Sequence, residues 1–318
     1  MDGNSSDFLG DFMFHGVINI YKEPGFTSHD VVAKLRGILR QKKIGHTGTL
    51  DPAAEGVLPV CLGKGTKLCD LLTDKRKTYQ AVLLLGTETD TQDTTGTILS
   101  EKPTEQLTEP AVRGAAESFV GPYMQVPPMY SALKVNGKKL YELARAGKEV
   151  ERAARPVEIY DLQIDAVELP RVTMTVTCSK GTYIRSLCAD IGGKLGCGGT
   201  MQSLVRTRVG EFRLADALTL AQLQELRDTD GLEEALLPTD RIFADFHAVH
   251  VEEKWRKLID NGNAFYPGQT MEQTTYPAGE WVRVYREDDS FVGIYAYDRA
   301  KEWYKPVKIF PSNTESRK

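Results

Sequence analysis

Two neighbouring segments with alternating apolar and polar residues set the tightest limit on how this chain folds. They are VEIYDLQIDAVEL (157–169) and RVTMTVTCSKG (171–181), and Pro170 alone stands between them. A period of two residues is typical of strands that bury one face. These segments therefore predict a pair of strands in the core of the fold.

Other segments follow helical or strand-like patterns on both sides of this pair. Thr27 or Ser28 is suited to cap a helix over residues 30–40, in which Val31, Leu35 and Leu39 recur at helical spacing. Further strands are expected over residues 17–21, 57–62 and 78–86, and further helices over residues 109–119, 183–195, 216–228 and 231–237. This mixture of elements indicates an α+β fold.

The pattern changes near residue 247, after which the chain predicts a small β-rich domain. Residues 255–265 fit a short helix, and residues 281–298 fit a hairpin of two alternating strands. We expect an N-terminal extension over 1–12, a main domain over 13–246, the small domain over 247–311 and a tail over 312–318. A Pro-rich and then basic stretch at about 124–152 predicts an exposed insertion that ends in a short helix.

Composition excludes several classes of protein. No apolar run approaches the roughly 20 residues that span a bilayer, and the first 14 residues do not resemble a secretory signal. The five cysteines form no CxxC pair, which predicts reduced thiols in a cytoplasmic protein. The five scattered histidines lack the spacing of a zinc site, so we expect no metal.

The charges are unevenly distributed along the chain. The net charge of −4 argues mildly against a nucleic-acid partner. However, residues 31–50 hold five basic side chains and no acidic one, and residues 132–155 hold seven basic and three acidic ones. Local basic surface is what neutralises phosphates, so these segments fit either an RNA-binding surface or an ordinary solvated face.

The loop GHTGTLDPAAEG (45–56) is the first motif suited to chemistry. Its glycines allow tight turns and close approach to a ligand, and Pro52 stiffens the chain directly after Asp51. An aspartate held in this way can face a cleft in a fixed direction. The same pattern also fits an Asx-turn in which Asp51 only caps the loop.

Three later motifs carry aromatic and basic side chains. In KRKTYQAVLLLG (75–86), Tyr79 is suited to stack on a base, with Lys75, Arg76 and Lys77 placed to neutralise nearby phosphates, or else Tyr79 fills a strand edge. In CSKGTYIRSLCADIG (178–192), Thr182 is suited to cap a helix, and Arg185 either pairs with a carboxylate, lowering its pKa, or lies on the surface. In LVRTRVGEF (204–212), two arginines suit phosphate contact or simple solvation.

Taken together, these motifs resemble the bacterial tRNA pseudouridine-55 synthases of the TruB family. GHTGTLDP, KTYQAVLLLG, CSKGTYIRSLCADIG and LVRTRVGEF occur in the order found in that family, and KEPGFTSHD and PPMYSALKVNGKKLYELAR also match. The resemblance covers about residues 16–245. It implies the pseudouridine-synthase fold, with a central mixed, mainly antiparallel sheet flanked by helices, and a small C-terminal PUA-like domain that binds RNA.

The resemblance also implies a role for individual residues. Asp51 matches the catalytic aspartate, Arg185 the arginine that pairs with it, and Tyr79 the tyrosine that stacks on the flipped uracil. Tyr183 and Leu204 match residues of the uridine pocket, and His46 matches the histidine that packs where the base has left the loop. Lys22 matches a lysine near the floor of the site, although the family reads KPxGxTS where this chain reads KEPGFTS.

The activity implied is isomerisation of uridine 55 in the T-loop of tRNA, with the nucleotide flipped out of its stack. The reaction is an internal rearrangement, so no cofactor is expected. The T-arm of tRNA is the expected partner, with no obligate protein partner, a monomeric state, and the insertion as a clamp over the RNA. Two other hypotheses stay open: an RNA-binding folding helper whose catalysis is secondary, and a synthase directed at another RNA.

Overall fold

The predicted strand pair lies inside a nine-stranded sheet. The computed structural model describes residues 13–135 and 137–310, so the predicted extension (1–12) and tail (312–318) lie outside the described residues. The two strands of this pair, β10 (Arg155–Glu168) and β11 (Arg171–Cys178), are antiparallel. The sheet order is β1-β3-β12-β4-β11-β10-β7, with β13 paired to β12 and β2 paired to β3. The bounds of the remaining strands are β1 (Gly16–Lys22), β2 (Ile44–His46), β3 (Glu55–Leu62), β4 (Lys77–Leu85), β7 (Gly121–Gln125), β12 (Gly199–Val209) and β13 (Phe212–Arg213).

This sheet is mixed and mainly antiparallel, as expected. Within the described sheet the pair β3–β12 is parallel, and the other pairs run antiparallel. The register places Val205 beside Glu55 and Leu204 beside Ala81. The end of β3 that follows the Asp51 loop is therefore brought next to β12, whose other edge pairs with β4.

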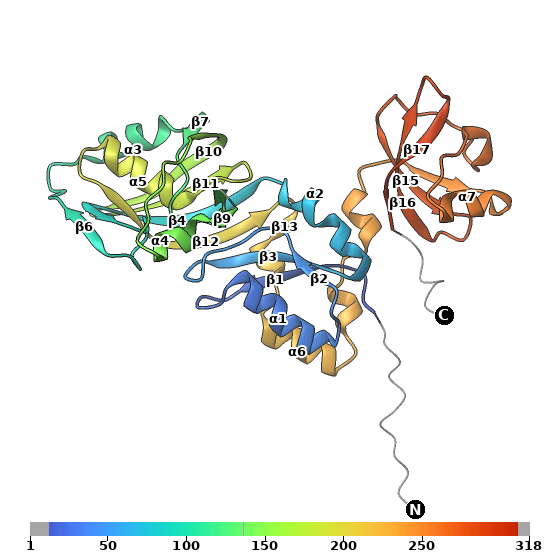
Figure 1. Cartoon of the computed structure of the whole chain (residues 1–318), viewed down its shortest axis with the longest axis horizontal. Coiled ribbons are helices and arrows are strands. Elements are labelled where there is room, and N and C mark those ends of the chain that lie inside the picture. The colour runs from blue at the N-terminus through green and yellow to red at the C-terminus, as the bar shows by residue number, and fades with distance from the viewer. Residues whose placement is uncertain (1–12, 136, 311–318) are drawn as a thin grey trace, which may run out of the picture.

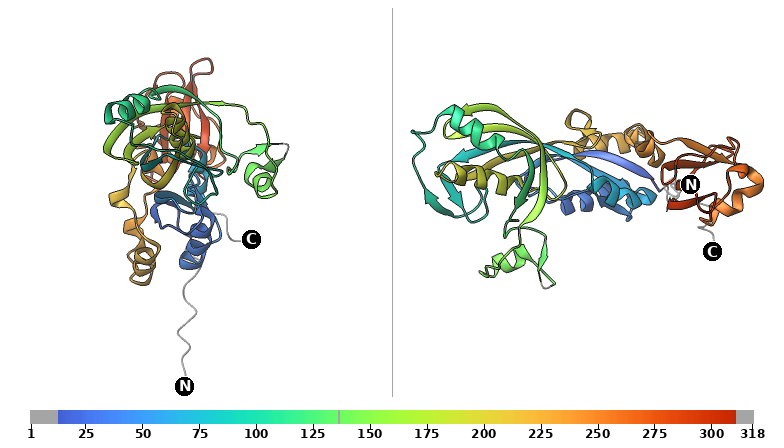
Figure 2. Two further views of the ribbon diagram at one scale, coloured as in Figure 1. Left: turned by 90° about the vertical axis from the view of Figure 1, so that its left-hand side faces the viewer. Right: turned by 90° about the horizontal axis from the view of Figure 1, so that it is seen from above.

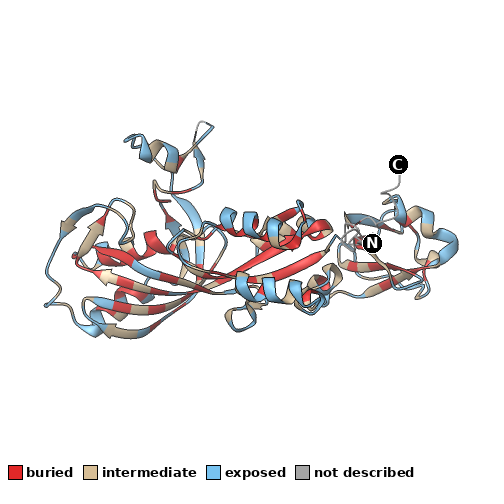
Figure 3. Ribbon diagram, turned by 90° about the horizontal axis from the view of Figure 1, so that it is seen from below, coloured by how far each residue is buried: buried red, intermediate tan, exposed pale blue. Residues whose placement is uncertain are grey.

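Two hydrophobic cores cover different parts of the sheet (Figure 1). One joins β1 and β3 to α1 (Ser28–Leu39) and α6 (Leu220–Asp228), and the other joins β4, β10, β11 and β12 to α3 (Glu109–Glu117) and α5 (Ile184–Lys194). Figure 3 shows the buried residues running along the central strands. The loop that carries Asp51 lies where the two cores meet.

Helix boundaries follow local capping chemistry. Thr27 is the cap of α1: it accepts from the backbone N–H of Asp30, whose carboxylate accepts from Thr27 in return. The expected helix over 216–228 begins later, at Leu220, because Thr219 and Gln222 form a capping box there. The expected helix over 231–237 is wrong in type, since only a short 3-10 turn spans Leu232–Ala235.

The basic insertion projects from the body of the molecule (Figure 2). It leaves the sheet after β7 and includes a small hairpin, β8 (Lys134–Val135) and β9 (Lys138–Lys139), followed by the predicted short helix α4 (Leu140–Arg145). About half of its described residues are exposed and few are buried. The chain returns to the sheet at Arg155, which pairs with Gln125.

A C-terminal β domain is present. Its four strands have the order β14-β15-β16-β17, where β15 (Trp281–Arg286) and β16 (Phe291–Asp298) form the predicted hairpin. β14 (Ala248–Val251), β17 (Trp303–Ile309) and the predicted short helix α7 (Arg256–Asp260) complete it. A hydrophobic cluster, here called the shared cluster, joins this domain to the main body; its buried members are Val17, Cys61, Leu68, Leu72, Phe243, Ile294 and Phe310.

Candidate active site

Asp51 lies in the loop between β2 and β3, and backbone contacts hold this loop from several sides. The Leu50 N–H donates to the Ser28 hydroxyl at 2.9 Å, and the Gly25 N–H donates to the Pro52 carbonyl at 2.8 Å. Gly48 has a φ of +136°, in a conformation that favours glycine, and Lys77 and Arg206 lie close beside it. The loop therefore presents Asp51 in one direction.

Two buried cationic side chains support the same loop from below. Lys22, at the end of β1, donates to the carbonyls of Ala54 at 2.6 Å and Pro52 at 3.3 Å. Arg206, on β12, donates to the carbonyls of Val57 at 2.7 Å and Gly48 at 3.3 Å. Both side chains are almost fully buried, so the loop carbonyls supply hydrogen-bond acceptors that water would otherwise provide.

Arg185 meets Asp51 from the first turn of α5. Its Nε lies 2.9 Å from Asp51 Oδ2, and an Nη2 proton is donated to Asp51 Oδ1 at 3.3 Å. The rest of the guanidinium donates to two backbone carbonyls, those of Thr91 at 2.9 Å and Tyr130 at 2.8 Å. Arg185 is 4% exposed and Asp51 is 37% exposed, so the arginine is locked in place while the carboxylate still faces open space.

The pKa of Asp51 is shifted in the opposite direction to the one that its pairing with Arg185 predicts. We expected Arg185 to set the pKa of this carboxyl below its ordinary value. Burial instead raises the pKa of Asp51, and Arg185 opposes the rise without reversing it. Asp93 adds to the rise in the pKa of Asp51, because its negative charge lies close to the ion pair.

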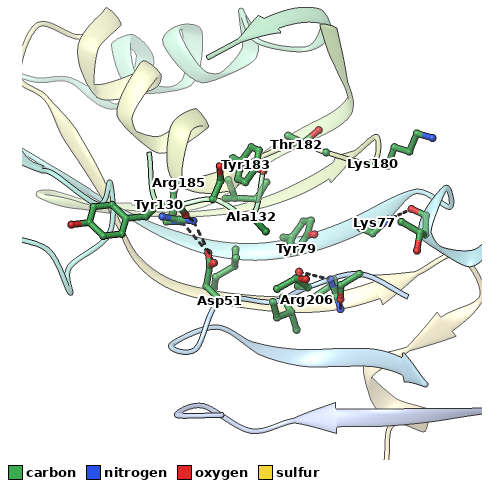
Figure 4. Close-up of a pocket in the computed structure, with 18 of the residues that line it drawn as sticks. Asp51, Lys77, Tyr79, Tyr130, Ala132, Lys180, Thr182, Tyr183, Arg185 and Arg206 are labelled. Atoms are coloured by element: carbon green, nitrogen blue, oxygen red, sulfur yellow. Dashed lines mark hydrogen bonds and ion pairs between the residues drawn. The ribbon is translucent and has the colours of Figure 1, made fainter. Parts of the chain in front are cut away.

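A cavity of about 380 Å³ opens over this ion pair (Figure 4). Its lining brings together five of the predicted residues: Asp51, Tyr79, Tyr183, Arg185 and Leu204. Tyr79 lies on β4 and is 7% exposed, and burial raises its pKa to about 12, so its hydroxyl stays protonated at neutral pH. Leu204 is 8% exposed. The cavity thus combines aromatic and apolar walls with one carboxylate, as small-molecule sites commonly do.

The other two predicted residues lie outside this lining. His46, at the end of β2, packs edge-on against His29 with ring centroids 5.3 Å apart, and its Nδ1 accepts from the Gly48 N–H. Burial and His29 lower the pKa of His46, which favours the neutral ring. Lys22 touches the backbone of the Asp51 loop and lies beneath the cavity; burial lowers its pKa to about 8.

The sequence of the site and of the sheet around it matches known families over most of the chain. Residues 36–184 match the TruB family pseudouridylate synthase N-terminal domain, and residues 185–244 match the tRNA pseudouridylate synthase B C-terminal domain.

The chain belongs to the TruB family of pseudouridylate synthases.

Relatives agree with this assignment. The tRNA pseudouridine synthase B of Lachnoclostridium phytofermentans is 53% identical over 306 residues, covering 93% of this chain and 99% of the relative. The corresponding protein of Alkaliphilus oremlandii is 47% identical over 295 residues, covering 93% and 97%. The alignments therefore cover most of this chain and of each relative.

Solved structures confirm the pseudouridine-synthase fold. A Cbf5-Nop10-Gar1 complex matches with a TM-score of 0.69 and 27% identity, covering 93% of this chain and 85% of that chain. An H/ACA RNP bound to a substrate RNA containing 2′-deoxyuridine matches with a TM-score of 0.69 and 25% identity, covering 94% and 86%.

Sequence reasoning missed the polar turn over residues 90–96 as part of the TruB-family site. The Thr91 carbonyl accepts from Arg185, and Asp93 lies 3.9 Å from the Arg185 Nε. The Gln92 side chain accepts from Ser186, the neighbour of Arg185, at 2.7 Å. The stretch DTQDTTG (90–96) has the composition of a polar turn; its five threonine and aspartate side chains between two strands were the available sign of a hydrogen-bonded loop.

Three expectations for polar residues near the site are wrong. Arg206 does not present its guanidinium as a phosphate contact would, because it is 1% exposed and bonded to loop carbonyls. Lys77 is also buried: it donates to the carbonyls of Thr73 and Lys75, and burial lowers its pKa to about 8. Thr182 does not cap α5, since its hydroxyl donates to the Ser179 carbonyl.

The described part of the chain holds no helix that is long and apolar enough to span a membrane. Within the same residues, no group of three or more His, Cys, Asp or Glu side chains is placed to hold a metal ion. The five cysteines are free thiols, of which Cys69 is the least buried.

Proposed function

We propose that this TruB-family synthase converts uridine 55 in the T-loop of tRNA to pseudouridine, with Asp51 as the catalytic carboxylate. The observation that carries the proposal is the ion pair of Asp51 with buried Arg185 at the base of a cavity walled by Tyr79 and Tyr183. The cavity of about 380 Å³ lies in the range of small-molecule sites and admits one flipped nucleoside.

Each lining residue has a part in handling the flipped base. The Tyr79 ring stacks on the uracil, a contact worth about 1–3 kcal/mol per base. Tyr183 and Leu204 close the apolar walls. His46 enters the gap that the base leaves in the RNA stack; its neutral ring suits such packing. Lys22 acts at one remove, because it supports the loop that carries Asp51.

The chemistry rearranges one nucleotide. The N1–C1′ bond breaks, the uracil turns, and C5 bonds to C1′ while the proton of C5 is lost and N1 gains one. The product has the same atoms as the substrate, so the reaction itself requires no cofactor. Asp51 acts in its ionised form, as nucleophile or base. Arg185 favours that form, since its positive charge opposes the effect of burial on the Asp51 pKa.

Exposed basic side chains supply the contacts with RNA phosphates. Five of them lie on α1 and on the loop between α1 and β2, all exposed in the structure: Lys34, Arg36, Arg40, Lys42 and Lys43. The projecting insertion, at about 124–152, acts as a clamp over the T-arm, and Lys134, Lys138, Arg145 and Lys148 are exposed on it. We assign the C-terminal domain over 247–311 as a PUA-like module that adds RNA contacts, in a monomeric cytoplasmic enzyme without an obligate protein partner.

The similarity to relatives favours tRNA over other RNA substrates. Identity is 53% to a tRNA pseudouridine synthase B that this chain matches over almost its whole length, against 25–27% to the synthases solved in H/ACA assemblies. Pseudouridine mapping in RNA from cells lacking the protein separates the two substrates: loss confined to the T-loop supports the proposal, and loss at ribosomal sites contradicts it.

The direct test is incubation of the purified protein with unmodified tRNA transcript, followed by pseudouridine mapping. Wild type modifies uridine 55, and Asp51→Asn, which cannot act as a carboxylate, does not. Asp161→Asn, at an exposed position on β10, serves as the matched control and retains activity. A wild type that makes no pseudouridine refutes the function, and an active Asp51→Asn refutes the assigned site.

A second activity, assistance in tRNA folding, is favoured by one observation. The basic surface of α1 and the insertion lies outside the cavity, so RNA binding does not depend on the reacting carboxylate. We therefore expect Asp51→Asn to bind tRNA and still accelerate its folding. If this variant binds but leaves the folding rate unchanged, the activity is confined to isomerisation.

A further inference from the structure

The helix that carries Arg185 begins without a side-chain cap of its own. Tyr183 is the cap residue of α5 and makes no side-chain capping bond, and the Thr182 hydroxyl turns back to the Ser179 carbonyl. A helix start leaves backbone N–H groups without partners inside the helix. Where such groups are buried, another part of the protein has to supply the bonds.

Gln125, the last residue of β7, supplies one of these bonds, to the N–H of the cap residue Tyr183. Its Oε1 accepts from the Tyr183 N–H at 2.8 Å, and its Nε2 donates to the Tyr183 carbonyl at 3.0 Å. The side chain is 2% exposed and lies 58 residues away in sequence. The Gln125 side-chain amide thus binds both the N–H and the carbonyl of Tyr183, which fixes the position and orientation of that residue's backbone.

The position of this contact links the insertion to the ion pair. Gln125 pairs with Arg155 where the insertion leaves and rejoins the sheet. Five residues after Gln125, the Tyr130 carbonyl accepts from the Arg185 guanidinium at 2.8 Å. Arg185 itself follows Tyr183 by two residues on α5. The residues at the start of the insertion therefore contact α5 in two ways: Gln125 binds the backbone of Tyr183, and the Tyr130 carbonyl binds the Arg185 side chain.

We propose that Gln125 is a positioning residue that holds the first turn of α5, so that the Arg185 fork meets Asp51 and the Tyr183 ring faces the cavity. This inference rests on the function proposed above. A helix moves nearly as a rigid rod, so loss of the Gln125 bonds displaces Arg185 relative to the Asp51 loop, which Lys22 and Arg206 hold independently. A displacement of about 1 Å at a reacting centre costs about a hundredfold in rate.

The same strand offers a matched control. Tyr123 lies two residues before Gln125, on the same face of β7. Its hydroxyl donates to the Asp190 carboxylate, about two turns along α5 from the cap. Both side chains therefore link β7 to α5 by hydrogen bonds, but of the two only Gln125 does so at the N-terminal end of α5, where Arg185 lies. Tyr123→Phe removes the bond to Asp190 and a contact of the same hydroxyl with the Gln125 side chain, but it retains every atom of the two Gln125–Tyr183 bonds.

The experiment compares Gln125→Glu, Gln125→Met and Tyr123→Phe with wild type in steady-state assays on unmodified tRNA transcript. We expect both Gln125 variants to lower kcat by about 10- to 100-fold, while KM for tRNA changes less than about threefold. Tyr123→Phe lowers the melting temperature but leaves kcat within about twofold of wild type. Melting curves establish the folded fraction of every variant.

The pH dependence of kcat in Gln125→Glu distinguishes hydrogen bonding from packing, because a residue that only fills space would give a variant-to-wild-type ratio that does not change with pH. A protonated glutamic acid has one donor and one acceptor, like the amide, whereas the carboxylate cannot donate to the Tyr183 carbonyl. The ratio of its kcat to that of wild type therefore rises as the pH falls from about 8 to about 5.5, since burial raises a glutamate pKa above about 4.3.

Either of two results overturns the proposal: a Gln125→Glu variant with wild-type kcat at pH 8, or an equal loss of kcat in Tyr123→Phe. A ratio for Gln125→Glu that does not change with pH also contradicts it, even if Gln125→Met fails to fold. A wild type that leaves uridine 55 unmodified is a separate outcome, because it refutes the proposed function and not the coupling between β7 and α5.

Discussion

Replacement of Arg185 by lysine tests the ion pair at the centre of the site, because it keeps the charge and removes the planar fork. Arg185 contacts both carboxylate oxygens of Asp51, at 2.9 and 3.3 Å, and the carbonyls of Thr91 and Tyr130 at 2.9 and 2.8 Å. One ammonium nitrogen cannot reach all four oxygens, since a lysine carries its donors on a single atom.

The expected loss follows from those contacts. A hydrogen bond to a charged group contributes about 1.5–3 kcal/mol, and the lysine forfeits one or two of them together with the orientation of Asp51. We therefore expect an increase of about 2–4 kcal/mol in the activation free energy, which is a fall of about 30- to 1,000-fold in kcat. Steady-state rates of pseudouridine formation at saturating tRNA measure this fall in kcat.

The matched control is the same substitution at an arginine that lies outside the cavity lining. Arg171, exposed on β11, donates to the Gln202 side chain, so Arg171→Lys retains wild-type kcat. Arg185→Met sharpens the test: without the positive charge the pKa of Asp51 rises further, and the acid limb of the pH–rate profile moves to higher pH. An Arg185→Lys enzyme within about twofold of wild type would show that the fork does not hold the reacting carboxylate.

Three further outcomes are expected. Wild-type kcat falls with pH through a pKa for Asp51 above its ordinary 3.8, because burial raises that pKa and only the ionised carboxylate acts; a profile still flat below pH 3.8 contradicts this. Arg206→Met leaves loop carbonyls without donors and lowers the free energy of unfolding by about 2–4 kcal/mol in urea titrations, whereas the exposed Arg208→Met changes it by less than about 0.5 kcal/mol. Backbone amides of the insertion exchange hydrogen more slowly once tRNA is bound, and equal exchange with and without tRNA excludes the clamp.

Much of the fold was predictable because local pattern and tertiary environment agree. The alternation in residues 157–181 reflects a sheet with one face against α3 and α5, so period and burial coincide. The helix over 231–237 failed for the opposite reason. Leu232 is buried against the core of α1 and α6, but the segment has room for one turn only, and apolar spacing does not report length.

The site was predictable as a set of residues and less so as a set of contacts. The motif order placed Asp51, Tyr79, Tyr183, Arg185 and Leu204 together, and they share one cavity. Burial was harder to foresee. Lys77 and Arg206 are residue types that commonly bind phosphates. Both instead turn inward and donate to backbone carbonyls, whose positions cannot be read from the sequence. Gln125 gave no signal, since its partner lies 58 residues away.

The shared cluster connects the C-terminal domain to elements that line or support the cavity of the proposed active site. Phe310 and Ile294 pack there with Leu72 of α2 (Cys69–Thr73), and the next residue, Thr73, lines the cavity. Val17 of the cluster belongs to the same strand as Lys22, the prop beneath Asp51. A truncation after residue 246 would therefore expose the hydrophobic residues of the shared cluster and weaken the packing of α2 and β1. About the last fifth of the chain thus helps to hold Asp51, which lies near the beginning of the chain, in position.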